Sequence, residues 1–208
     1  MKKIMFSDEF QLTKAVLEGR KTMTRRVIPA KAIEYILGEF KQEYFEGTLD
    51  VFDSDKKYIE QYYLVEKRGK CFRPGDIVAV AQKYKDMMPY LADSFRQPSS
   101  NYMMDKPGYN NKMFVRADHM PHQIRITNVR VERLQEISDE DCIREGVFLD
   151  KTAPSCYQPF YTFPGSIDYD TPVGYKTPRD AFAVLIDRIS GKGTWEKNPW
   201  VLAYEFKN

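Results

Sequence analysis

The stretch Glu18-Gly19-Arg20-Lys21-Thr22-Met23-Thr24-Arg25-Arg26, residues 18–26, marks a passage from a helix to a strand. Upstream of it, Ser7 is placed to cap a helix over about residues 8–18, and Gly19 supplies its C-terminal stop. The β-branched residues that follow predict a strand over about 22–28. The stretch therefore sets the order of the first two elements.

Charge is concentrated in the same place. All the charged residues between Glu18 and Glu34 are basic, namely Arg20, Lys21, Arg25, Arg26 and Lys31. In the predicted strand, which Pro29 ends, the alternation of side chains puts Thr22, Thr24 and Arg26 on one face. This pattern is typical either of an anion-binding segment or of a solvated basic loop, and charge alone leaves both open.

The composition is that of one globular domain over residues 1–208, with 42% hydrophobic and 30% charged residues. Lys and Arg number 32 against 30 Asp and Glu, and a net charge of +2 disfavours tight binding to long RNA. No run approaches the roughly 20 apolar residues of a membrane span, and the first residues do not resemble a secretory signal. We therefore expect a cytoplasmic protein with no membrane partner.

Cysteine and histidine usage predicts neither disulfides nor a metal site. The three cysteines are Cys71, Cys142 and Cys156, and none forms a CxxC pair. The two histidines, His119 and His122, lack further ligands at metal-binding spacing. We expect no metal and no cofactor.

The remaining pattern predicts an α+β fold. Strands are expected over 77–80, 123–134 and 200–206, the second with a bulge near Thr127 and Asn128 because its apolar residues change parity there. Helices are expected over about 139–145, capped by Ser138, and from Thr177 to a stop at Gly191. Residues of about 35–70 are expected to form an insertion with helical pieces, and about 86–111 a long loop. A bulged strand of this kind favours a small β-barrel with flanking helices.

Residues 18–26 after an amphipathic helix resemble the signature of the ASCH family, a branch of the PUA-like superfamily. Further segments resemble that family in the expected order: Pro74-Gly75-Asp76-Ile77-Val78, Ile126-Thr127-Asn128-Val129-Arg130, Ser138 to Gly146, and Trp200 to Phe206. The chain departs from the family at Ala79-Val80-Ala81-Gln82-Lys83-Tyr84, where many relatives carry a Trp-Val-Arg-Glu-x-Trp run. The resemblance implies a PUA-like β-barrel whose cleft suits RNA or a nucleoside-like small ligand.

The resemblance also implies a possible activity. Some small ASCH proteins are amidohydrolases that remove the acetyl group of N4-acetylcytidine with a Lys, a Thr, an Arg and a Glu, which match Lys21, Thr24, Arg26 and Glu145. In that role Thr24 is the nucleophile, and Lys21 is its base once its pKa falls by roughly 3 units from about 10.4. Glu145 serves as base, as acid, or as an opposing charge on Lys21. Arg26 holds an oxyanion or a substrate carbonyl.

Two other classes of function compete with a hydrolase. In a non-catalytic RNA- or nucleotide-binding module, Arg20, Lys21, Arg25 and Arg26 hold phosphates while Tyr84 stacks on a base. In an interaction protein, the aromatic residues of the insertion carry the partner surface, unless they simply pack on the domain: Tyr44, Phe45, Tyr58, Tyr62 and Tyr63. The sequence leaves the oligomeric state open.

Overall fold

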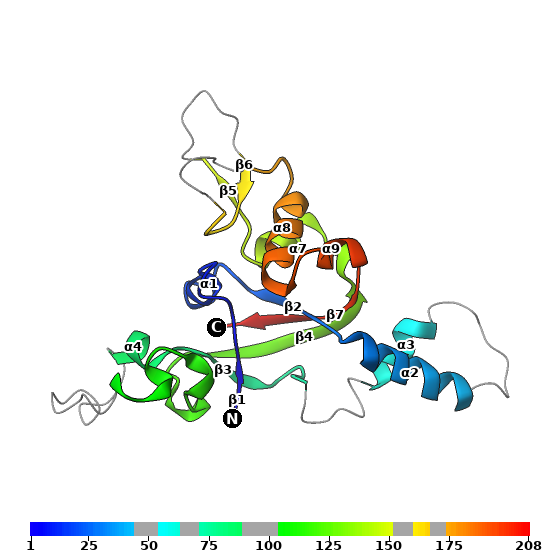
Figure 1. Cartoon of the computed structure of the whole chain (residues 1–208), viewed down its shortest axis with the longest axis horizontal. Helices are drawn as coiled ribbons and strands as arrows, with labels where there is room; N and C mark the ends of the chain where they lie inside the picture. Colours follow the sequence, from blue (N-terminus) through cyan, green and yellow to red (C-terminus); the bar gives the residue numbers. More distant parts are fainter. Residues whose placement is uncertain (44–53, 63–70, 89–103, 152–159, 167–173) are drawn as a thin grey trace.

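The computed structural model describes residues 1–43, 54–62, 71–88, 104–151, 160–166 and 174–208 (Figure 1). At its centre lies a five-stranded sheet of order β1-β3-β4-β7-β2. Its strands are β1 (Lys2–Ile4), β2 (Met23–Val27), β3 (Ile77–Val80), β4 (Gln123–Arg133) and β7 (Trp200–Lys207). β1 runs parallel to β3, and the other pairs are antiparallel. A separate hairpin pairs β5 (Phe148–Asp150) with β6 (Phe160–Thr162).

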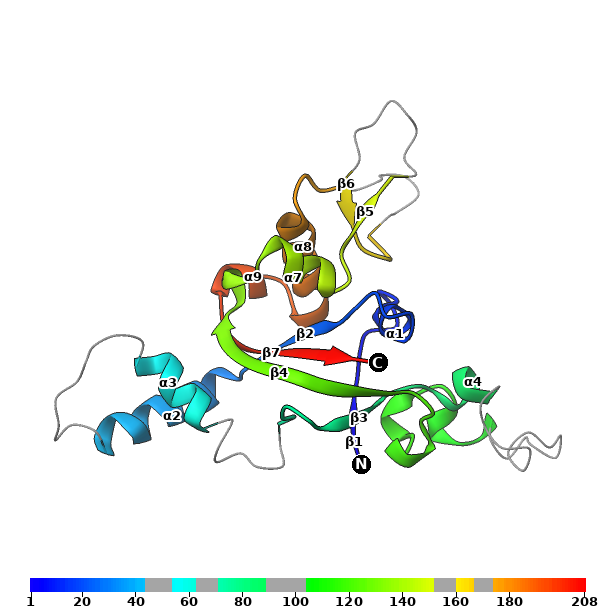
Figure 2. The same ribbon diagram turned by 180° about the vertical axis from the view of Figure 1, so that it is seen from behind.

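Helices surround this sheet unevenly. The α-helices are α1 (Leu12–Leu17), α2 (Ala30–Glu43), α3 (Ser54–Gln61), α4 (Tyr84–Met87), α7 (Asp139–Arg144), α8 (Pro178–Ser190) and α9 (Thr194–Lys197). Short 3-10 helices cover Pro107–Tyr109, Lys112–Phe114, Ala117–His119 and Leu134–Glu136. In both Figure 1 and Figure 2, α7, α8 and α9 gather on the β2 side of the sheet, whereas α2–α3 and α4 lie beyond its opposite ends. Within these described ranges no helix combines the length and apolarity needed to cross a bilayer.

The α+β mixture is as predicted, but the prediction of a β-barrel is wrong. The central sheet is open, with β1 and β2 as its two edges. β1 stops at Ile4, and among the described residues the contact past its end with β2 is made by a side chain: Arg26 of β2 donates to the Met5 carbonyl and lies 5.8 Å from the Phe6 ring. A barrel needs edge strands long enough to exchange a ladder of backbone hydrogen bonds, and this short strand provides none to β2.

Several local predictions are confirmed. The register of β4 against β7 shifts between Ile126 and Asn128, which is the expected bulge. The Ser138 hydroxyl accepts from the Asp141 amide at 3.1 Å, and α7 follows at once. Thr177 caps α8 in the same way through the Asp180 amide, also at 3.1 Å. Strong local caps and turns thus formed where the sequence placed them.

The prediction of a helix capped by Ser7 is wrong in its start. Residues 8–11 form turns, and α1 begins only at Leu12, after Gln11 in a left-handed conformation (φ 50°, ψ 24°). The reason is tertiary: Asp8 accepts from the Thr13 hydroxyl at 2.6 Å and from the Lys112 ammonium at 2.6 Å. The carboxylate that the sequence assigned to the helix N-terminus is used in this network instead.

The described parts of the predicted insertion pack on the domain. Ile36 of α2 and Tyr58, Ile59 and Tyr62 in and just after α3 are buried in the same apolar cluster as the central strands. The aromatic residues Tyr58 and Tyr62 are therefore core residues. Residues 44–53 and 63–70 of the insertion, and 89–103 of the predicted long loop, lie outside the described residues.

Candidate functional site

Lys21 and Glu145 meet in the interior, although 124 residues separate them in the chain. Gly19, with φ of +73°, turns the chain out of α1, and the Thr22 amide donates to the Arg144 carbonyl at 2.9 Å, which fastens the start of β2 to the end of α7. The Lys21 Nζ then donates to Oε2 of Glu145 at 2.6 Å and to the Glu145 carbonyl at 2.7 Å. Both side chains are buried, and Lys21 is only 1% exposed.

Burial holds the pKa of Lys21 below its ordinary value. The adjacent Glu145 carboxylate acts in the opposite direction, and the guanidinium groups of Arg26 and Arg25 add to the lowering. The ring of Phe6 lies 5.8 Å from Nζ, a cation–π contact that, like Glu145, favours the charged form. A lowered pKa makes a lysine better suited to act as a general base.

Thr24 shares a small cavity with this lysine. The cavity has a volume of about 40 Å³, and its polar lining comprises Ser7, Lys21, Thr24, Arg25, Arg26 and Glu145. Thr24 is 5% exposed, and no hydrogen bond within the described part of the chain involves its hydroxyl. A hydroxyl and an amine of lowered pKa thus border one enclosed space.

The rest of the cavity lining is apolar. It is formed by Phe6, by Leu12 of α1, and by one face of α8 that carries Phe182, Leu185, Ile186 and Ile189. Their spacing is that of a helical stripe. No site residue was predicted on α8, and only its amphipathic period after Thr177 and Pro178 signalled that a face of this helix is buried.

Arg25 occupies a buried network of carboxylates. Its guanidinium contacts Glu132 at 2.6 Å, Asp141 at 2.8 Å and Glu145 at 3.3 Å, and its side chain is 1% exposed. Burial acts to lower the pKa of Arg25, but these carboxylates outweigh it and the pKa is raised. The Arg25 guanidinium, which was predicted to hold a substrate phosphate, instead contacts these three carboxylates.

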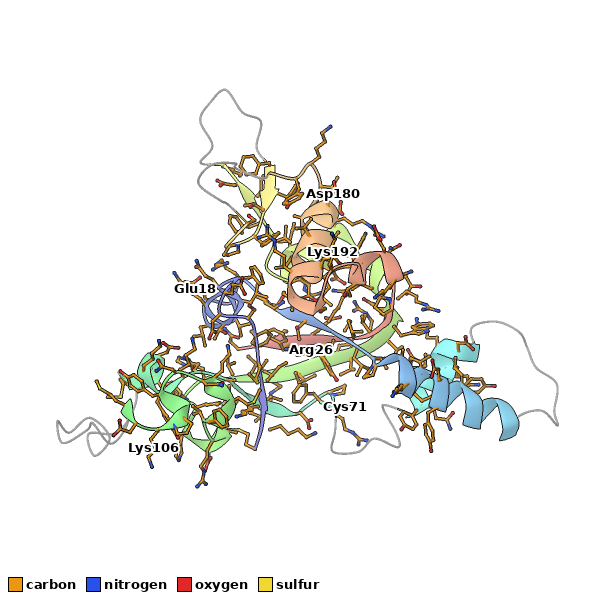
Figure 3. The ribbon with its side chains drawn as sticks, in the orientation of Figure 1. Glu18, Arg26, Cys71, Lys106, Asp180 and Lys192 are labelled. Carbon is orange, nitrogen blue, oxygen red and sulfur yellow. The ribbon has the colours of Figure 1, made fainter. Side chains whose placement is uncertain are left out.

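The other predicted arginines differ from each other. Arg26 lines the cavity, donates to the Met5 carbonyl and lies 5.8 Å from the Phe6 ring, and burial lowers its pKa. Arg20 is exposed and pairs with Glu18 at 2.5 Å. Figure 3 shows Arg26 near the centre of the molecule and Glu18 on the outer side with α1. Only Arg26 of this pair is placed to meet a ligand in the cavity.

Tyr84 is not brought to Lys21. It is buried on α4 in a second apolar cluster with Ala79, Met87 and Val115, and its hydroxyl lies 3.0 Å from Nδ1 of His119. It does not line the cavity of Thr24. The structure therefore places this predicted stacking residue in a separate part of the fold.

A larger hollow of about 370 Å³ lies between α1 and the start of α4, lined among others by Asp8, Lys83, Gln82 and His122. Burial acts to raise the pKa of Asp8, but hydrogen bonds from Lys112, Thr13 and Lys83 outweigh it and lower the pKa to about 2. None of the predicted catalytic residues lines this hollow. Among the residues that the structure describes, no three His, Cys, Asp or Glu side chains cluster as metal ligands would.

Comparison with known proteins adds no relative. No family model matches the chain, and neither a curated protein nor a solved structure matches it. The class of site is therefore defined by its own chemistry: a buried amine, a hydroxyl and a carboxylate around one small cavity.

Proposed function

We propose that the protein is an amidohydrolase that removes a small acyl group from the exocyclic nitrogen of cytosine-like nucleosides. The observation that carries this proposal is that Lys21, with its lowered pKa, borders the same enclosed cavity as the Thr24 hydroxyl. The resemblance of residues 18–26 to the ASCH family supplies the substrate class. The pairing of a hydroxyl nucleophile with an adjacent base supplies the reaction class.

In the proposed reaction, the neutral Lys21 amine takes the proton of the Thr24 hydroxyl while Oγ1 attacks the acyl carbon. The C–O bond forms, the carbonyl becomes an oxyanion, and the Arg26 guanidinium on the same wall stabilises its charge. Collapse of this intermediate breaks the C–N bond, and the Lys21 ammonium returns the proton to the leaving amine. Water then hydrolyses the acyl-threonine, again with Lys21 as the base, and releases a carboxylic acid.

Glu145 positions the base. Its carboxylate and its backbone carbonyl both accept from the Lys21 Nζ, at 2.6 and 2.7 Å, and so fix the amine at the cavity wall. The carboxylate also stabilises the ammonium that forms in each half of the reaction. The residue thereby limits how far the lysine pKa falls and keeps proton transfer reversible.

The charge distribution favours this proposal over a phosphate-binding module. Arg20 is paired with Glu18, Lys21 with Glu145, and Arg25 with three carboxylates. A nucleic-acid backbone would have to displace these partners before it gained a contact. A small uncharged acyl group needs no such exchange.

The test is turnover of N4-acetylcytidine and N4-acetylcytosine by purified protein, followed by chromatography. Wild type should release acetate, whereas Thr24→Ala should lose at least about 100-fold in kcat/KM because no nucleophile remains. Thr22→Ala is the matched control, since Thr22 is a neighbouring hydroxyl whose contact is with Arg144 and which does not line the cavity. A folded wild type that hydrolyses neither compound would contradict the proposal.

A further inference from the structure

The cavity beside Thr24 is far smaller than a nucleoside site. Ligand pockets for whole small molecules usually measure about 300 Å³ or more, whereas this cavity holds about 40 Å³. One water needs about 10–15 Å³ measured in the same way, so the space corresponds to about three atoms of that size. An acetyl group has two carbons and one oxygen. The cavity therefore matches the acyl group of the proposed substrate and excludes its heterocycle.

The two walls of the cavity also match the two ends of an acyl group. Lys21, Thr24 and Arg26 offer polar atoms to a carbonyl, and the α8 face that also lines the cavity offers only carbon. The α8 wall is fixed, because Phe182, Leu185 and Ile186 are at most 5% exposed and belong to the main apolar core. A carbonyl directed toward Thr24 leaves its alkyl chain directed at this wall.

We infer that the α8 face, and Ile186 in particular, limits the length of the acyl chain and restricts the reaction to one- and two-carbon acyl groups. The inference rests on the proposed hydrolase function and adds a specificity-determining element to it. Each further methylene must enter a space already closed by Leu185 and Ile186. In an apolar pocket one methylene changes kcat/KM by about 10- to 200-fold.

The experiment measures kcat/KM for N4-formyl-, N4-acetyl-, N4-propionyl- and N4-butyrylcytidine. For wild type we expect a fall of at least about tenfold from acetyl to propionyl, and a further fall to butyryl. Ile186→Ala removes three carbons from the wall, and butyryl adds two carbons to acetyl, so this variant should hydrolyse the butyryl compound at least about tenfold better than wild type. A variant that merely lost folded protein would lose activity on all four compounds instead.

Ile137→Ala is the matched control, because Ile137 is equally buried in the same core but does not line the cavity. It should keep the wild-type order of substrates. A wild type that hydrolyses all four compounds equally would leave the proposed function standing and overturn the inference. An Ile137→Ala variant that gains butyryl activity as Ile186→Ala does would also overturn it, since general loosening would then explain the gain. A wild type inactive on every compound would overturn the proposed function and this inference with it.

Discussion

Replacing Arg25 by alanine should destabilise the protein without acting through a ligand. The side chain is 1% exposed and faces three carboxylates, so its removal leaves buried negative charge without its partner. Breaking a buried ion pair in this way costs about 3–5 kcal/mol. Here the lower end applies, because Arg130 also contacts Glu132 and Asp141, at 3.3 and 3.0 Å.

Urea denaturation followed by circular dichroism measures this loss. With a denaturant slope of about 2 kcal/mol per molar, a loss of about 3 kcal/mol lowers the midpoint by about 1.5 M. The urea midpoint of Arg25→Lys should lie between those of wild type and Arg25→Ala, because one ammonium cannot contact three carboxylates as a guanidinium does. Arg20→Ala is the control: the pair of Arg20 with Glu18 is exposed, and its loss should leave the midpoint unchanged.

An Arg25→Ala variant that unfolds at the wild-type urea concentration yet no longer binds nucleosides or RNA would contradict this prediction. Arg25 would then be a ligand-binding residue, as the basic segment suggested.

Three further outcomes are expected. The pKa of Asp8 is lowered from 3.8 to about 2, so its contribution to stability is present above pH 4 and lost as the pH falls toward 2. Asp8→Asn, at a side chain one-third exposed, should cost about 1–2 kcal/mol at pH 7 in urea denaturation, and a difference that persists unchanged at pH 2 would contradict this. Gly108→Ala puts a Cβ 2.6 Å from the Tyr84 ring, so it should cost about 1–3 kcal/mol of stability and lower the melting temperature. Gly38→Ala, at a helical position with no heavy atom within 4 Å of the new Cβ, should raise the melting temperature. Burial raises the pKa of Cys142 to about 12, so mass spectrometry should find it unmodified by iodoacetamide at pH 8 until urea unfolds the protein.

The elements that the sequence predicted well are those specified by local signals. Ser138 and Thr177 cap α7 and α8 because a short side chain three residues before a free amide suffices, whatever the rest of the chain does. The parity change at Thr127 and Asn128 likewise located the bulge of β4, since a strand with one buried face must keep its apolar residues on it.

The candidate site was predictable only in part. The resemblance of residues 18–26 and 138–146 to one family selected Lys21, Thr24 and Glu145, and all three line one cavity. The same segment made Arg25 a ligand-binding candidate, because a list of basic residues does not say which carboxylates the fold brings to them. Tyr84 was selected as an aromatic residue able to stack on a base, and α4 holds it in a different apolar cluster.

The sequence by itself determined the α+β content, the caps of α7 and α8 and the bulge of β4, because each depends on residues close together in the chain. Only the tertiary structure decided that the sheet stays open, that α8 closes the cavity, and that Glu145 reaches Lys21. Sheet closure depends on how far β1 extends beside a distant strand. The lowering of the Lys21 pKa depends on burial, which exists only after residues 124 positions apart have packed together.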